Sequence, residues 1–134
     1  MSNYDKYPEI KIKGFSKHAW EGYDQICSVI QEKIKDKNKG IIVIDLYPGV
    51  NDEEILDAFK ALQPTLIIKS DECAYDGETI TYMIKDYLTD DRIFGSLTTK
   101  RLEDYFIHEK IVEARNKILS NSNGICLVYG VGAS

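Results

Sequence analysis

The residues best placed to do chemistry are the last five of the chain, which follow the apolar run ICLVY. An apolar strand that runs into glycines can bring backbone N–H groups close to a phosphate. The full phosphate-binding loop is G-x-x-x-x-G-K-[ST], and here Leu127 takes the first glycine position and Ala133 the lysine position. The pattern predicts a degenerate nucleotide-binding turn without the lysine that binds the β- and γ-phosphates. Its candidate cofactor-binding residues are Gly130, Gly132 and Ser134.

Asp45 is the second candidate, because it directly follows the apolar run Ile41–Ile44. A carboxylate at the end of a buried strand can hold a magnesium ion through water. The same position also suits a carboxylate that caps a turn or accepts a backbone N–H. The sequence leaves both roles open, so Asp45 is a candidate metal ligand and a candidate turn cap.

Other residue types with chemical potential are scattered. His18 and His108 lie ninety residues apart, and no G-x-S-x-G, H-E-x-x-H or C-x-x-C motif occurs. The three cysteines, Cys27, Cys73 and Cys126, are odd in number and far apart, which favours small buried hydrophobic residues over a disulfide framework or zinc ribbon. No catalytic residue is predicted.

Composition and charge narrow the class of protein. The 134 residues, 43% of them hydrophobic, suit a single packed domain. The net charge of -5 is uneven: eight lysines face six acids in residues 1–40, and nine bases face sixteen acids in residues 41–134. This acidity argues against nucleic acid and an anionic membrane surface as partners. With no leader-like start and no apolar run of about 18 residues, a cytoplasmic protein is expected.

Hydrophobic periodicity alternates between short apolar runs and helical stripes. It predicts strands at 9–13, 41–44, 65–69, 93–97 and 125–129, and helices at 16–37, 51–63, 80–87, 102–106 and 111–119. The alternating segment EIKIK, residues 9–13, is typical of an edge strand, and the β-branched run at 41–44 is typical of a central parallel strand covered on both faces. Asn51 is expected to cap the helix that follows it, with Glu54 reaching back.

Strands separated by helices indicate a mainly parallel sheet with helices on both faces. The fold class is therefore α/β, a three-layer sandwich of Rossmann-like or P-loop-like type. Ligands of such sheets lie beyond the carboxyl ends of the strands, which are residues 47–51 and 130–134 here. The chain ends after two glycines, before any helix that would complete an anion site. We interpret residues 1–134 as one domain, and as the N-terminal fragment of a longer protein.

Four segments together resemble the N-terminal region of large bacterial class I mannose-6-phosphate isomerases and isomerase-like cupins: GFSKHAWEGYDQIC, IIVIDLYPGVNDEEILDAF, LTDDRIFGSLT and ICLVYGVGAS. The resemblance implies a P-loop kinase-like front domain of a protein in sugar-phosphate metabolism. It places aldose-ketose isomerisation, with its zinc, in a cupin part that is absent here. No isomerase residue carries over, so no cofactor is expected in this chain, and the expected partner is the downstream domain.

Three functions follow as hypotheses. The first is an accessory α/β domain of an isomerase-like protein, without catalysis of its own. The second is part of a nucleotide-dependent kinase built on the degenerate P-loop and Asp45. The third is an interaction module that assembles subunits through its acidic surface or its nine tyrosines, which predicts an oligomer.

Overall fold

A computed structural model describes residues 5–15, 17–91 and 94–134 of the chain. The regular elements are α1 (Gly22–Ile34), β1 (Lys39–Asp45), α2 (Asp52–Phe59), β2 (Leu66–Lys69), α3 (Gly77–Ile84), α4 (His108–Ser120) and β3 (Gly124–Gly130). Short 3-10 turns follow α2 at Lys60–Leu62, β2 at Ser70–Cys73 and α3 at Lys85–Tyr87, and another, at Leu102–Tyr105, precedes α4.

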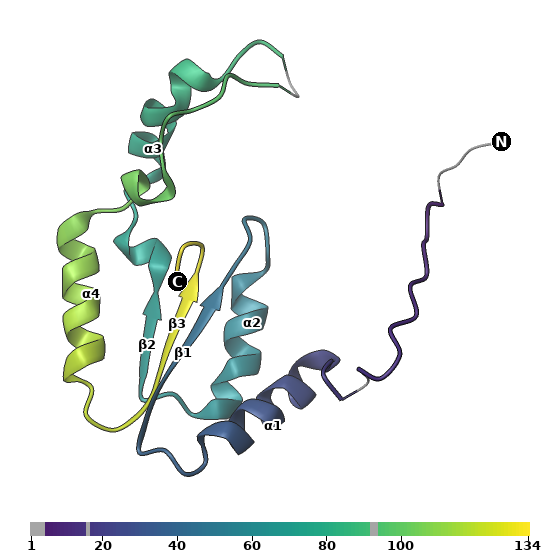
Figure 1. The fold of residues 1–134 in the computed structure, drawn as a ribbon. Coiled ribbons are helices and arrows are strands. Elements are labelled where there is room, and N and C mark those ends of the chain that lie inside the picture. Colours follow the sequence, from purple (N-terminus) through teal and green to yellow (C-terminus); the bar gives the residue numbers. More distant parts are fainter. Residues whose placement is uncertain (1–4, 16, 92–93) are drawn as a thin grey trace.

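The three strands form one parallel sheet in the order β1-β3-β2 (Figure 1). The last strand along the chain is therefore the central one. β1 pairs with β3 along its whole length, from Lys39 beside Gly124 to Asp45 beside Gly130. Both strands thus end at the same edge of the sheet, which brings the two candidate sites of the sequence together.

Helices cover the two faces unequally. On one face, α1 and α2 pack on β1 and β3 around a buried cluster of Cys27, Ile55, Phe59, Leu62 and Leu127. On the other face, α4 places Ala114 and Ile118 against Cys126 and Val128 of β3 and Ile68 of β2. The helices at the two sides of the sheet in Figure 1 make three layers, and the expected α/β sandwich with a parallel sheet is confirmed.

The prediction that residues 41–44 form a central strand covered on both faces is wrong. β1 lies at an edge of the sheet, and Ile41 and Val43 are 52% and 46% exposed. Ile41 pairs with Cys126, and Val43 with Val128, so all four side chains project from the face that carries α4. α4 covers β3 and β2 on that face and leaves β1 open.

The predicted strand at residues 9–13 is also absent. Residues 9–12 have no regular secondary structure, Lys13 lies in a turn, and Ile10 and Ile12 are 84% and 71% exposed. Alternation of apolar and polar residues indicates a strand only where a neighbouring strand supplies hydrogen bonds. Of the predicted strand at 93–97, residues 94–97 are irregular and residue 93 lies outside the described residues.

The remaining elements agree with the sequence within a few residues, apart from the first helix, which begins at Gly22 instead of residue 16, itself outside the described residues. Asn51 caps α2 by accepting a hydrogen bond from the Glu54 backbone N–H at 3.4 Å, as expected. All three cysteines are buried and unpaired, which confirms them as core residues. Among the helices in the described part of the chain, none has the length and apolar content to span a bilayer.

Candidate functional site

Asp45 and the C-terminal turn meet at the carboxyl edge of the sheet. The Gly132 backbone N–H donates to Asp45 Oδ1 at 3.0 Å, and the Ser134 hydroxyl donates to Asp45 Oδ2 at 2.8 Å. The Leu46 N–H, one residue further, donates to the Gly130 carbonyl at 3.0 Å. The structure thus brings together all four residues that the sequence singled out: Asp45, Gly130, Gly132 and Ser134.

These hydrogen bonds favour the ionised form of Asp45. The Ser134 hydroxyl has the largest effect and lowers the pKa of the Asp45 carboxyl below its usual value, while partial desolvation opposes it. Backbone N–H groups of the turn, beginning with Gly132, lower the same pKa further. At neutral pH, Asp45 is therefore a carboxylate that accepts donors from the turn.

Ser70 holds the same turn from the side of β2. Its hydroxyl donates to the Val131 carbonyl at 2.8 Å, and Ser70 itself is buried. Gly130 has a φ of +125°, and a Cβ placed there would come within 2.1 Å of Ser70 Oγ. Only glycine allows this combination of backbone conformation and close approach. Ser70 is a residue of the candidate site that the sequence analysis missed, because nothing local marks a serine after β2.

Asp45 and Ser70 therefore hold the C-terminal turn, residues 130–134, between the ends of β1 and β2. We call this arrangement the clamp. In a phosphate-binding loop the backbone N–H groups point at an anion. Here the Gly132 N–H and the Ser134 hydroxyl point at a carboxylate of the same chain. The Asp45 carboxylate occupies the place of an external anion for these two donors.

An ion pair also lies at this edge of the sheet. Lys69, the last residue of β2, forms an ion pair with Asp52 at the start of α2, and its Nζ lies 3.5 Å from Asp71. The hydrogen bond between the Lys69 and Asp52 side chains lowers the pKa of Asp52 and raises that of Lys69. Lys69 Nζ also lies 5.9 Å from the ring centroid of Tyr129. Lys69 ends a predicted strand, but Asp52 belongs to the helix that follows the next turn, so the sequence analysis did not single out this pair.

An apolar groove of about 530 Å³ opens beside the turn, on the face that α4 covers only in part. One wall is β1, with Ile41 and Val43, and the other is α4. The C-terminal turn and the 3-10 turn before α4 also line the groove. The remaining lining residues that matter here are Leu102, Phe106, Ala114, Arg115, Ile118 and Ser134. The mostly apolar groove therefore adjoins the polar contacts of the C-terminal turn.

Residues 22–134, which hold every helix and strand described above, match a family described as a domain of unknown function, DUF8485. The chain belongs to the DUF8485 family. No curated protein and no solved structure matched the chain.

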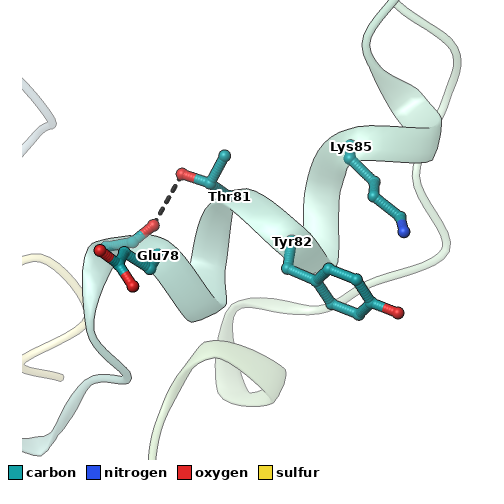
Figure 2. A pocket seen from close by; sticks show the side chains of 5 residues that line it. Glu78, Thr81, Tyr82 and Lys85 are labelled. Atoms are coloured by element: carbon teal, nitrogen blue, oxygen red, sulfur yellow. Dashed lines mark hydrogen bonds between the residues drawn. The ribbon is translucent and has the colours of Figure 1, made fainter.

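A separate hollow of about 440 Å³ lies on the outer surface of α3 in the DUF8485 domain (Figure 2). The Thr81 hydroxyl there donates to the Gly77 carbonyl of its own helix at 2.7 Å, and Lys85 Nζ lies 3.9 Å from the Tyr82 ring centroid. The side chains come from one face of one helix, and Tyr82 and Lys85 lie away from Glu78. Their contacts stabilise a helix surface and assemble no reactive group.

The histidines and the aromatic residues at the start of α1 lie apart from the clamp. His18 and His108 are exposed, His108 as the first residue of α4. Trp20 is half-exposed before α1, and Tyr23 meets Phe59 edge-on at 6.4 Å between ring centroids. The candidate chemistry of the domain is therefore concentrated at the ends of its three strands.

Proposed function

We propose that this DUF8485 domain is an accessory, non-catalytic α/β domain that docks the downstream part of a larger isomerase-like protein. The observation that carries the proposal is the open strip of Ile41 and Val43 on β1, beside their buried partners on β3. The involvement of the larger protein in sugar-phosphate metabolism, and the zinc in its cupin part, rest on the sequence resemblance.

The groove has the character of a protein contact surface. Its walls are mainly aliphatic and aromatic side chains from β1, α4 and the 3-10 turn before α4, and its polar lining residues are Ser70, Glu103, Arg115 and Ser134. Large apolar surfaces left open on a domain commonly mark interaction sites. Covering the strip would complete the third layer of the sandwich over β1, as α4 already completes it over β3 and β2.

The position of the C-terminal turn indicates which segment binds in the groove. Gly132, Ala133 and Ser134 all line the groove, so any segment joined to Ser134 would start in the groove. The clamp of Asp45 and Ser70 fixes this starting point. A tethered segment binds with a high effective concentration, which favours a groove beside the attachment point. We therefore assign the groove to the downstream part of the same protein.

The docking proposal is tested by the solvent exposure of the Ile41 and Val43 methyl groups. NMR with a soluble paramagnetic probe would be recorded on residues 1–134 and on the natural gene product at full length. We expect strong line broadening in the first sample and protection in the second. Ile67, 40% exposed on β2, is the control and should broaden equally in both. Equal broadening of Ile41 and Val43 in both samples would exclude docking.

A second candidate function is nucleotide binding. The observation in its favour is the pairing of Ser134 with Asp45 beside Gly132, at the end of an apolar strand. A hydroxyl and a carboxylate are oxygen ligands of the kind that magnesium takes, with the carboxylate acting through water. Nucleotide binding would require the turn to exchange Asp45 for phosphate as the acceptor of its donors.

Thermal unfolding separates the two candidates. A ligand that binds only the folded state raises the melting temperature. The accessory-domain proposal expects no shift with magnesium and ATP or with mannose 6-phosphate, on residues 1–134 and on the full-length gene product with its cupin metal removed. A shift with magnesium and ATP that disappears in Ser134→Ala would favour the nucleotide candidate and contradict a purely accessory role.

A further inference from the structure

We propose that two copies of this chain exchange their N-terminal segments, with residues 9–13 of each copy adding as a strand to the free edge of β1 in the other. The exchange is a property of residues 1–134 and does not depend on the proposed docking of a downstream domain. Its occupant is a second copy of the same chain.

The acceptor is the outer edge of β1. Within the described residues, β1 pairs with β3 on one side and with no strand on the other. It is a seven-residue strand, Lys39–Asp45, rich in β-branched residues at its centre. An edge strand of this length and composition presents unpaired N–H and C=O groups to another chain, and natural proteins usually protect such edges with charges, prolines or bulges. Residues 40–44 of β1 contain none of these devices.

The donor is the segment 9–13. Its sequence EIKIK alternates as a strand with one apolar face, but Ile10 and Ile12 are among the most exposed apolar side chains described, at 84% and 71%. Residues 9–12 have no regular secondary structure, Lys13 lies in a turn, and none of the five residues pairs with a described strand. A strand addition would satisfy the backbone of both partners and remove the two isoleucines from water, as in β-augmentation.

The geometry favours a second copy over the segment's own β1. Figure 1 shows residues 5–15 running outward beyond α1, away from the sheet of their own chain. Residues 5–15 carry three lysines against two acids and residues 41–134 carry nine bases against sixteen acids, so the segment and the rest of the domain have opposite net charge. Reciprocal exchange uses the same surfaces on both copies and closes as a twofold dimer, in which the edge of β1 is paired in each copy.

The experiment is analytical ultracentrifugation of residues 1–134 over a wide concentration range. We expect a concentration-dependent rise in mass from 15.3 kDa to twice that value. Ile10→Asp with Ile12→Asp should raise the dissociation constant by at least about tenfold, because aspartate disfavours strands and the two burials are lost. Ile10→Val with Ile12→Val is the matched control and should dimerise nearly as wild type does.

Hydrogen exchange on the same samples identifies the edge. In the dimer, amides of residues 9–13 and of β1 should both become protected as the concentration rises, whereas those at the outer edge of β2 should not. A chain that stays monomeric at every concentration overturns the proposal, including the case in which residues 9–13 are protected by their own β1. So does a dimer that the double aspartate variant leaves intact, or one that protects the edge of β2 instead.

Discussion

β1 and β3 lie side by side in matched register, and both have uninterrupted apolar centres, yet their surroundings are opposite. β3 has a strand on each side and a helical layer on each face, and its Leu127 is 1% exposed. β1 has one neighbour and one covered face, and its Ile41 is 52% exposed. The two strands carry similar side chains, so composition alone does not decide which of them becomes the centre of the sheet.

The difference in exposure between β1 and β3 indicates where the domain has an uncovered apolar surface. An edge strand that faces water permanently would be expected to alternate apolar and polar residues. β1 instead carries IIVI, a pattern suited to burial on both faces. The sequence of β1 therefore fits a larger assembly than one copy of residues 1–134, and both proposals above add a partner to this strand, one on its face and one on its edge.

The largest effect on stability is expected from shortening an apolar side chain in the middle of β3, compared with the same change in β1. Leu127→Ala should lower the free energy of unfolding by about 3 kcal/mol, because a fully buried leucine leaves a cavity between β3 and the helices α1 and α2. Ile41→Ala should cost about 1 kcal/mol or less, since half of that side chain already faces water. Urea unfolding measures both. Equal losses would mean that β1 is as enclosed as β3.

Glycine substitutions sharpen the comparison through the backbone. Gly130→Ala should destabilise the fold by about 2 kcal/mol, because its φ is +125° and the new Cβ would meet Ser70 Oγ. Gly40→Ala in β1 is the control: its φ is not positive and nothing lies within 4 Å of the added Cβ, so the change should be neutral or slightly stabilising.

Removal of the serine hydroxyl checks the cause of that loss. In Gly130→Ala with Ser70→Ala, the closest clash disappears, and part of the stability should return despite the lost hydrogen bond to Val131. Chemical denaturation of the single and double variants gives the coupling between the two sites. Additive losses would show that the close approach of Ser70 is not the reason for glycine at position 130.

The positions of helices and strands along the chain were more predictable from the sequence than the packing of these elements against one another. The period of apolar residues indicated the helical stripes and the apolar strands, and the Asn51 cap followed from residue types within one turn. Strand order depends on which helix packs on which face, and no local pattern contains it. For this reason the pattern of IIVI predicts a central strand and that of EIKIK an edge strand, although neither pattern contains its partner.

The candidate site shows the same division. Asp45 and the glycines of the last turn were recognisable because they end apolar runs, and the parallel sheet brings such ends to one edge. Their contacts were not predictable. The sequence offered Asp45 as a metal ligand or a turn cap, and the structure gives it hydrogen bonds from Gly132 and Ser134. Ser70 and the pair of Lys69 with Asp52 arise from tertiary packing.

A smaller effect is expected from pH, acting on the clamp where β1 and β3 end. Because folding lowers the pKa of Asp45, the unfolded chain binds its proton more readily, and the stabilisation is present above the unfolded pKa of about 3.9. Asp45→Asn should be less stable than wild type at neutral pH, and the difference should shrink as the pH falls through the lowered pKa. Asp86→Asn, at an exposed position after α3, controls for general charge effects. A difference independent of pH would contradict this role.

The smallest effect on stability should come from the open strip itself. Ile41→Ser with Val43→Ser should change the free energy of unfolding of residues 1–134 by only about 1 kcal/mol in total, since both side chains are half-exposed. Under the docking proposal, the same pair should lower the melting temperature of the proposed longer gene product by more, because docking would bury the strip there. Ile67→Ser, at the other edge and on the opposite face of the sheet, should act equally in both proteins. If the double serine variant also acts equally in both, the strip faces water in the complete protein, and the contrast between β1 and β3 has no functional meaning on that face.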